Sequence, residues 1–479
     1  MENYSESHVL SEREKLSVLT GRNEPGADYP KDKYVYELFD SRGEDFRLKE
    51  RSMASPKNRR LDLFSEKESK ARYYVRHFPA LFSRAKNEFL YDVSGNKYID
   101  FLSGAGALNY GHNNPIIKKE LIKYLRNDGI IHSLDKATEA KERFINEFCK
   151  TILAPRGYDH KIQFTGPTGT NAVEAALKLA RMAKKRASVM AFTKGYHGNT
   201  LGALAVTAND YYKNDFFCMA NGTVFMPYDQ YLGPDVNTIG HLKKYLEDSG
   251  SGIALPAAVI LETIQGEGGI NVAGRKWLQD LSALCRDHDI LLIIDDIQVG
   301  NGRTGTFFSF EDYGIVPDIV VVSKSIGGGL PFSFVLMKPE LDVWKPGQHT
   351  GTFRGNNLAF VAGAAILRKY WRDGAFSDSI AKKSAYLKRS LEEIKGDHSG
   401  LGIQIRGKGL IYGLEFKDKA FAAAVSRKCF QKNLVVETCG TQDETLKILP
   451  PLTIGQDALE KGAGIIKNAV LEIKNGKKS

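Results

Sequence analysis

Cysteine is scarce in this chain and forms no metal-binding or redox motif. The sequence of 479 residues contains five cysteines, with no CxxC pair among them. An odd number of scattered cysteines argues against a disulfide framework, and their spacing does not resemble a zinc site. We therefore expect a reduced protein without a metal. The five are Cys149, Cys218, Cys285, Cys429 and Cys439.

Long hydrophobic runs are also absent. No apolar stretch approaches the roughly 20 residues that a helix needs to cross a bilayer. The first residues, Met1–Ser7, lack the basic stretch and apolar core of a secretion signal. The sequence thus predicts a cytoplasmic protein with no membrane association.

Charge of one sign is not concentrated anywhere, although the net charge is +10. Lys and Arg residues are spread along the chain without a long basic run, which argues against nucleic-acid binding. A positive balance instead suits anionic small molecules. Hydrophobic residues at 42% and charged residues at 26% are ordinary for a globular protein. The length allows several domains, or one large α/β enzyme with additions.

Short apolar runs separated by helical patterns predict a doubly wound α/β domain. Such runs are typical of strands in a parallel sheet that is buried on both faces. Before them, a hairpin is expected over 89–101, and after about residue 360 a shorter α+β pattern follows. The runs are 257–261, 290–294, 319–322 and 332–337, and the later strands are 409–416 and 446–449.

Composition divides the chain into four parts. Residues 1–70 mix both charges densely and hold few apolar residues, which predicts a charged, partly flexible N-terminal extension. Whether this extension is a docking segment, a lid or an inert tail is left open. Residues 71–115 are expected to join the small domain, 116–360 to form the large domain, and 361–479 to form the small C-terminal domain.

Lys324 comes directly after an apolar run of strand length, 318–322, and Ser323. An ammonium at the end of a buried strand is costly unless it is neutralised or used. Lysine amines form Schiff bases with carbonyl compounds, and burial frees the amine by lowering its pKa. Lys324 is therefore a candidate covalent catalyst. The alternative is a lysine that extends from the strand end into solvent.

A glycine- and threonine-rich turn, 166–171, precedes a helical pattern and includes Gly169 and Thr170. Backbone N–H groups and hydroxyls at a helix N-terminus favour an anion, so the turn predicts a phosphate site. It is not a P-loop, because no Gly-Lys-Ser/Thr follows at the required spacing. An ordinary threonine-capped helix start is the alternative.

Asp295 follows the apolar run 291–294 and lies at the carboxyl end of the predicted strand. Ligands in open α/β sheets bind at these ends, so a carboxylate there is well placed to hold a protonated ring nitrogen. A metal is the alternative for the pair Asp295-Asp296. No histidine accompanies the pair at ligand spacing, so the metal is disfavoured.

Tyr196 and His197 lie between Gly195 and Gly198. The glycines allow close approach, and an aromatic ring there suits stacking on a planar cofactor. Taken alone, the segment is better explained as a surface turn with a packed tyrosine. Together, however, the phosphate site, the aromatic ring, the carboxylate and the lysine supply the contacts that pyridoxal 5'-phosphate (PLP) requires.

Longer motifs make the chain resemble class III, ω-type, PLP-dependent aminotransferases of fold type I over roughly residues 75–470. The resemblance implies a large PLP-binding domain, whose mostly parallel sheet lies between helices, and a smaller α+β C-terminal domain. The motifs are ETIQGEGG at 262–269, DDIQVGNGRTG at 295–305, SK at 323–324 and RGKG at 406–409.

The resemblance assigns cofactor roles residue by residue. Lys324 would hold PLP covalently and later move a proton, while Asp295 would keep the ring nitrogen protonated. Gln298 would hydrogen-bond the ring 3-hydroxyl, and Tyr196 would stack on the ring. His197, next to Tyr196, belongs to the same predicted cofactor site.

The resemblance also implies active sites shared between subunits. Gly169 and Thr170 would bind the phosphate of PLP in their own subunit. Thr352, within 351–356, resembles the threonine that reaches the phosphate of the neighbouring subunit. A homodimer or higher homo-oligomer follows from this arrangement.

Within the class, the chain most resembles 2,4-diaminobutyrate:2-oxoglutarate aminotransferases of the ectoine-pathway kind. This implies amino transfer from L-glutamate to an aldehyde, L-aspartate 4-semialdehyde, giving L-2,4-diaminobutyrate and 2-oxoglutarate. The small-molecule donor and acceptor would contact Asn109, Glu267 and Lys447. Many glutamate-using relatives have an arginine in place of Lys447, and lysine offers a point charge instead of a bidentate fork. The supporting segments are 104–115, 165–174 and 341–347.

Other functions stay open on the sequence. Another class III aminotransferase would act on a different ω-amine, such as ornithine or lysine. An aminomutase would use the same cofactor without consuming a keto acid. A PLP-fold binding or scaffold protein would be no enzyme, and the presence of Lys324 and Asp295 argues against it.

Overall fold

The computed structural model describes residues 59–214, 217 and 222–476. The chain divides into two compact units, 1–79 and 80–479. The described part of the first unit contains helices α2 (Arg59–Lys67) and α3 (Tyr74–His77). Most of the predicted extension 1–70, and also Cys218, lies outside the described residues.

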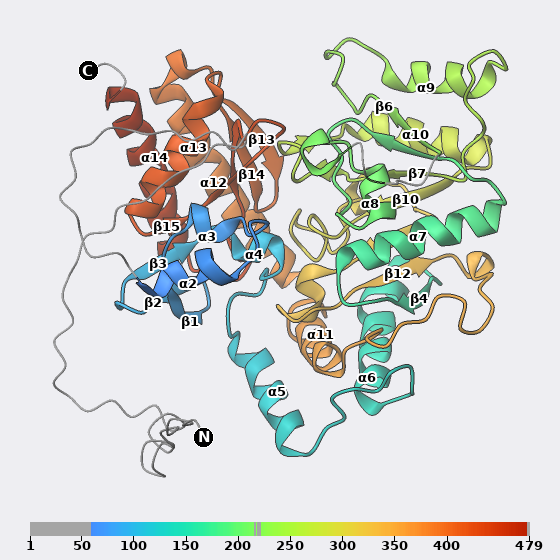
Figure 1. The fold of residues 1–479 in the computed structure, drawn as a ribbon, viewed down its shortest axis with the longest axis horizontal. Helices are drawn as coiled ribbons and strands as arrows, with labels where there is room; N and C mark the ends of the chain where they lie inside the picture. Colours follow the sequence, from blue (N-terminus) through green and yellow to red (C-terminus); the bar gives the residue numbers. More distant parts are fainter. Residues whose placement is uncertain (1–58, 215–216, 218–221, 477–479) are drawn as a thin grey trace, which may run out of the picture. The chain divides into compact units, whose positions relative to one another are not determined.

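A sheet of seven strands organises the second unit (Figure 1). The predicted strands at 257–261, 290–294 and 319–322 are confirmed as β7, β10 and β11. The sheet is mostly parallel, as the apolar runs indicate. In order across the sheet, its strands are β4 (Lys161–Phe164), β12 (Phe334–Met337), β11 (Ile319–Val322), β10 (Leu291–Asp295), β7 (Ala258–Leu261), β5 (Val189–Phe192) and β6 (Thr223–Met226).

Strand β12 is the exception, because it runs antiparallel to both of its neighbours, β11 and β4. Only residues 323–333 connect β11 to β12. A parallel return needs a crossover of about a dozen residues or more, usually through a helix, so this connection is too short for one. The segment instead contains Lys324 and the short 3-10 helix η5 (Lys324–Gly327).

Apolar side chains cover both faces of the sheet. Along β10, Leu291 and Ile293 belong to the core that contains α7 (Gly169–Lys184). The alternate residues, Leu292 and Ile294, belong to the opposite core. Because side chains alternate between faces, burial on both sides requires the continuous apolar runs seen in the sequence. Figure 1 shows α7 extending beside these strands, which it contacts.

Helices cover the sheet and build the remainder of the second unit. The α-helices are α4 (Ser103–Gly106), α5 (Pro115–Arg126), α6 (Glu139–Phe148), α7, α8 (Leu201–Val206), α9 (Thr238–Glu247), α10 (Arg275–Asp287), α11 (Asn357–Tyr370), α12 (Ala375–Asp397), α13 (Lys419–Gln431) and α14 (Gln456–Gly476). The shorter helical turns are η1 (Cys149–Leu153), η2 (Ala154–Arg156), η3 (Asp210–Tyr212), η4 (Glu311–Tyr313), η5, η6 (Pro339–Leu341) and η7 (Ser399–Leu401).

Smaller sheets lie outside the large one. An antiparallel sheet of four strands has the order β13-β14-β17-β16. The predicted hairpin over 89–101 is confirmed as β2 and β3, and β3 pairs in parallel with β15 from the C-terminal region. The remaining strands are β1 (Phe82–Lys86), β2 (Phe89–Asp92), β3 (Lys97–Asp100), β8 (Ile264–Gln265), β9 (Asn271–Val272), β13 (Gln404–Lys408), β14 (Ile411–Glu415), β15 (Leu434–Val435), β16 (Glu437–Cys439) and β17 (Thr445–Ile448).

The β3–β15 pair joins segments more than three hundred residues apart into one core. Phe101, directly after β3, is fully buried with Ile466 and Val470 of α14. Residues near 100 therefore share a core with the C-terminal helices. The domain limits predicted from composition stay predictions. Among the described residues, no helix is both long and apolar enough to cross a membrane.

Two glycines of α14 should respond oppositely to alanine. A Cβ on Gly462 would overlap the ring of Phe101, whereas a Cβ on Gly464 meets nothing within 4 Å. We expect Gly462→Ala to destabilise the protein by about 1–3 kcal/mol through overpacking. Gly464→Ala should stabilise the helix by about 0.5–1 kcal/mol. Thermal unfolding of both variants in one buffer checks this, and a Gly462→Ala midpoint at or above that of Gly464→Ala would contradict the packing of Phe101.

Candidate active site

Asp295 and Lys324 lie at the same edge of the large sheet. Asp295 is the last residue of β10 and is paired with Val321 of the parallel neighbour β11. Lys324 follows β11 by two residues. It adopts a left-handed backbone conformation, with φ of 54°, which is uncommon for a residue with a side chain. The carboxyl ends of parallel strands thus bring the predicted acid and lysine to one place.

The Lys324 side chain is half-buried, and its surroundings favour the neutral amine. Burial lowers the pKa of Lys324 below that of an ordinary lysine, and the nearby Lys447 lowers it further. Glu267, Glu437 and Asp295 act in the opposite direction without cancelling the effect. A lowered pKa increases the fraction of unprotonated, nucleophilic amine.

His197 holds the Asp295 carboxylate in place. Its Nδ1 lies 2.7 Å from Oδ2 of Asp295, and both side chains are buried. Burial alone would lower the pKa of His197, but the hydrogen bond and charge of Asp295, with a contribution from Glu262, raise it overall. The other Asp295 oxygen, Oδ1, accepts from the backbone N–H of Ile297 at 3.2 Å. The acid is therefore oriented from two sides.

The predicted phosphate site is the N-terminus of α7, which begins at Gly169. Oγ1 of Thr170 lies 2.8 Å from Oγ1 of Thr200, which in turn donates to the Glu174 carboxylate. Because Thr200 donates to Glu174, the Thr170 hydroxyl donates to Thr200 in this arrangement. A Cβ at Gly198, whose φ is +125°, would overlap Thr170. The Gly195–Gly198 turn and the start of α7 therefore approach closely.

Tyr196 and Gln298 lie near the same acids. The backbone N–H of Tyr196 donates to Glu262 at 3.0 Å, and its ring meets that of Tyr212 edge-on. Nε2 of Gln298 donates to Oε1 of Glu267 at 3.0 Å. Burial raises the pKa of Glu262 to about 7, so this acid carries a proton more readily than an exposed glutamate.

Lys447 lies between two carboxylates. Its Nζ is 2.6 Å from Oε1 of Glu267 and 3.1 Å from Oε1 of Glu437. The Lys447 side chain is 0% exposed. Although burial opposes the change, the charges of Lys447 and Lys324 and the hydrogen bonds that Glu267 accepts lower its pKa to about 2. Glu267 therefore stays ionised, and it acts electrostatically on both lysines.

Two of the predicted site residues, Asn109 and Thr352, contact residues other than those described above. Asn109 is buried; its Oδ1 accepts from Arg303, and its Nδ2 donates to the backbone of Asn301 at 3.1 Å. Thr352 is exposed, and its carbonyl oxygen lies 2.9 Å from Nε2 of His132. The contacts of this chain do not link Thr352 to the predicted phosphate site. The roles assigned to both residues stay predictions.

Sequence reasoning missed three contributors. Glu437 became visible only through the register of β16 with β17, which no local pattern specifies. Thr200, which precedes α8, contacts Thr170, and Glu174 of α7 accepts from Thr200. Glu174 lies within the segment 165–174 already singled out, so its position one turn after Thr170 was the available signal.

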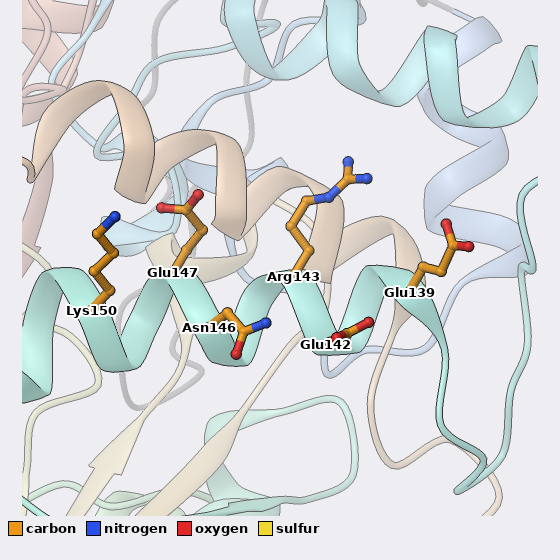
Figure 2. A pocket seen from close by; sticks show the side chains of 6 residues that line it. All are labelled: Glu139, Glu142, Arg143, Asn146, Glu147 and Lys150. Atoms are coloured by element: carbon orange, nitrogen blue, oxygen red, sulfur yellow. The ribbon is translucent and has the colours of Figure 1, made fainter.

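A surface pocket of about 430 Å³ lies apart from these residues, along α6 (Figure 2). Its lining contains none of the predicted site residues. Glu147 pairs with Arg372 at 3.5 Å and with Arg368 at 3.9 Å, so part of this charged surface is already neutralised. The lining consists of Glu139, Glu142, Arg143, Asn146, Glu147 and Lys150.

The residues present fit PLP. Lys324 offers an amine, Asp295 a fixed carboxylate for the ring nitrogen, and α7 a helix N-terminus for the phosphate. Within the described residues, Oε1 of Gln298 is buried without a hydrogen-bond partner. A buried acceptor of this kind suits the 3-hydroxyl of PLP, which can donate to it.

Comparison with known proteins agrees with this geometry. The family described as Aminotransferase class-III matches residues 71–470. Diaminobutyrate–2-oxoglutarate transaminase of Wolinella succinogenes is 56% identical over 411 residues, which cover 86% of this chain and 96% of the relative. The protein of the same name from Bordetella parapertussis is 52% identical over 414 residues, or 86% of this chain and 95% of the relative.

Solved structures show the same fold. The ornithine aminotransferase of Toxoplasma gondii is 26% identical, with a TM-score of 0.77 over 87% of this chain and 95% of that chain. The family implies PLP as the cofactor, and the predicted α/β architecture of fold type I is confirmed. The resemblance inferred from the motifs is also confirmed. The chain belongs to the class III aminotransferases, and it is a PLP-dependent aminotransferase.

Proposed function

We propose that this enzyme transfers the amino group of L-glutamate to L-aspartate 4-semialdehyde, giving 2-oxoglutarate and L-2,4-diaminobutyrate. The proposal is carried by the fully buried Lys447, which lies within the electrostatic reach of Lys324 and pairs with Glu267. A buried lysine near the reactive amine suits a site that binds a substrate carboxylate. Relatives named diaminobutyrate–2-oxoglutarate transaminase support the choice of substrates.

Lys324 and Asp295 carry the chemical step in this proposal. PLP, when bound, supplies an electron sink for the substrate carbon that carries the amino group. Asp295, fixed by His197 and the Ile297 N–H, holds the ring nitrogen in its protonated form. Nζ of Lys324 would take the proton from the substrate carbon that carries the amino group and would deliver it to C4′ of the cofactor. The lowered pKa of Lys324 suits it to act as this base.

Lys447 holds the carboxylate next to the reacting carbon of L-glutamate. To do so, it must exchange its contact with Glu267, 2.6 Å away, for the substrate carboxylate. L-2,4-Diaminobutyrate reacts at its terminal amine and has no carboxylate on that carbon. With this substrate the Lys447–Glu267 pair stays closed, so one site accepts two differently charged reacting ends.

A homodimer with shared active sites is part of the proposal. Apolar side chains on the segments around Thr352 are exposed: Phe353 is 66%, Ile131 55% and Ile130 52% exposed. The His132–Thr352 contact and the edge-on rings of His132 and Phe353 join these segments into one surface. Apolar exposure of this kind favours burial against a second copy, which would bring Thr352 to the partner's phosphate site.

Purified PLP-loaded protein should react with L-glutamate alone. We expect the yellow colour to fade as 2-oxoglutarate forms in a stoichiometric amount, because the first half-reaction needs no acceptor. The matched control is Lys324→Ala, which should give no repeated turnover when an acceptor is added. The measurements are absorbance and 2-oxoglutarate released. Unchanged colour with L-glutamate, or multiple turnovers by Lys324→Ala, would contradict the proposal.

A panel of amines tests the second substrate. We expect L-2,4-diaminobutyrate with 2-oxoglutarate to give a higher kcat/KM than L-ornithine or L-lysine, because the latter two are longer than the proposed substrate. Product analysis should show L-glutamate and L-aspartate 4-semialdehyde. Preference for ornithine or lysine would assign a different ω-amine. Rearranged diamine formed without any keto acid would instead indicate an aminomutase.

A further inference from the structure

Two acids contact Lys447, although the proposed exchange of Glu267 for a substrate carboxylate requires only one. Glu437 lies 3.1 Å from Nζ of Lys447, in addition to Glu267 at 2.6 Å. A buried cation must be compensated, and a single carboxylate is enough for one lysine. Both acids also act on Lys324, so the part that Glu437 plays at Lys447 depends on how each acid is held.

The two acids are held very differently. Glu437 belongs to β16 and is paired directly with Lys447 of β17, so the ladder fixes both on one face of the sheet. Its side chain is 5% exposed. Glu267 lies in the turn between β8 and β9, and its side chain is 27% exposed. Of the two, Glu267 is therefore the acid that can move away.

The pairing of Glu437 has a consequence for the exchange at Lys447. When Glu267 leaves, Lys447 is not an uncompensated cation, because Glu437 remains opposite it in the ladder. An incoming carboxylate then meets a lysine that is already neutralised. Its attraction to the site is weaker than it would be to an isolated buried cation, since the like charge of Glu437 opposes it.

We propose that Glu437 is a specificity-determining residue, which weakens binding of a carboxylate on the reacting carbon and so favours terminal amines as substrates. This inference rests on the proposed function, because it concerns the balance between the two substrates assigned there. Glu437 acts through Lys447 and does not react itself.

Glu437→Gln tests this role, with Glu437→Asp as the matched control that keeps the charge. For each variant and the parent, single-turnover rates of the PLP-loaded protein are measured against concentration of L-glutamate and of L-2,4-diaminobutyrate. Because both substrates react with the same preparation, their ratio of kcat/KM does not depend on the fraction of active protein. The affinity for glutarate, an unreactive dicarboxylate, is measured by calorimetry as a second readout.

We expect Glu437→Gln to raise the ratio of kcat/KM, L-glutamate over L-2,4-diaminobutyrate, by about tenfold, the effect of one charge-assisted contact. The change should come from a lower KM for L-glutamate, and glutarate should bind more tightly. Glu437→Asp should keep the parent ratio.

An unchanged ratio and unchanged glutarate affinity in Glu437→Gln would overturn the inference while leaving the proposed function intact. An equal shift in Glu437→Asp would also overturn it, since the charge is then not the cause. If the parent protein reacts with neither substrate, the proposed function fails, and the inference fails with it.

Discussion

The cost of placing two lysines near one another, one half-buried and one fully buried, governs the active site. Lys324 and Lys447 lie close enough for the charge of Lys447 to lower the pKa of Lys324. Two ammonium groups in such a place are unfavourable unless acids compensate them. Glu267 and Glu437 do so for Lys447, and Glu267 also acts on Lys324. The result is one lysine paired with two acids beside another whose pKa is lowered.

The fold supplies these charges from separate elements. The large parallel sheet brings Asp295 and Lys324 to the same edge through neighbouring strands. The small antiparallel sheet supplies Lys447 and Glu437 through a single pair in its ladder. Glu267 comes from the β8–β9 turn and contacts both Lys447 and Gln298. The active site thus combines residues at the strand ends of the large sheet with a strand pair of the small sheet.

Local sequence patterns predicted the strands whose burial depends on residues close together in the chain. The apolar runs before Asp295 and Lys324 gave β10 and β11, and therefore the position of both side chains. The antiparallel direction of β12 was not anticipated, because it depends on the length of a connection and not on the pattern of the strand. An apolar run predicts that a strand is buried on both faces, but the same run fits a parallel or an antiparallel strand.

The remaining site contacts join residues far apart in the chain. His197 and Asp295 are separated by 98 positions, and Lys447 and Glu267 by 180. The motifs identified these residues as candidates but did not predict the hydrogen bond and ion pair between them. Glu437 was missed for the same reason, although only ten positions separate it from Lys447. A strand as short as β16 gives too little pattern to set its register, and the register alone places the acid opposite the lysine.

Chemical labelling of Lys324 and Lys447 tests the account most directly. Borohydride reduction of the PLP-loaded protein, followed by peptide mass spectrometry, identifies the amine joined to the cofactor. We predict a pyridoxyl group on Lys324 alone, because burial lowers its pKa while Lys447 is ion-paired with both Glu267 and Glu437. A pyridoxyl group on Lys447, or no label on Lys324, would contradict the account.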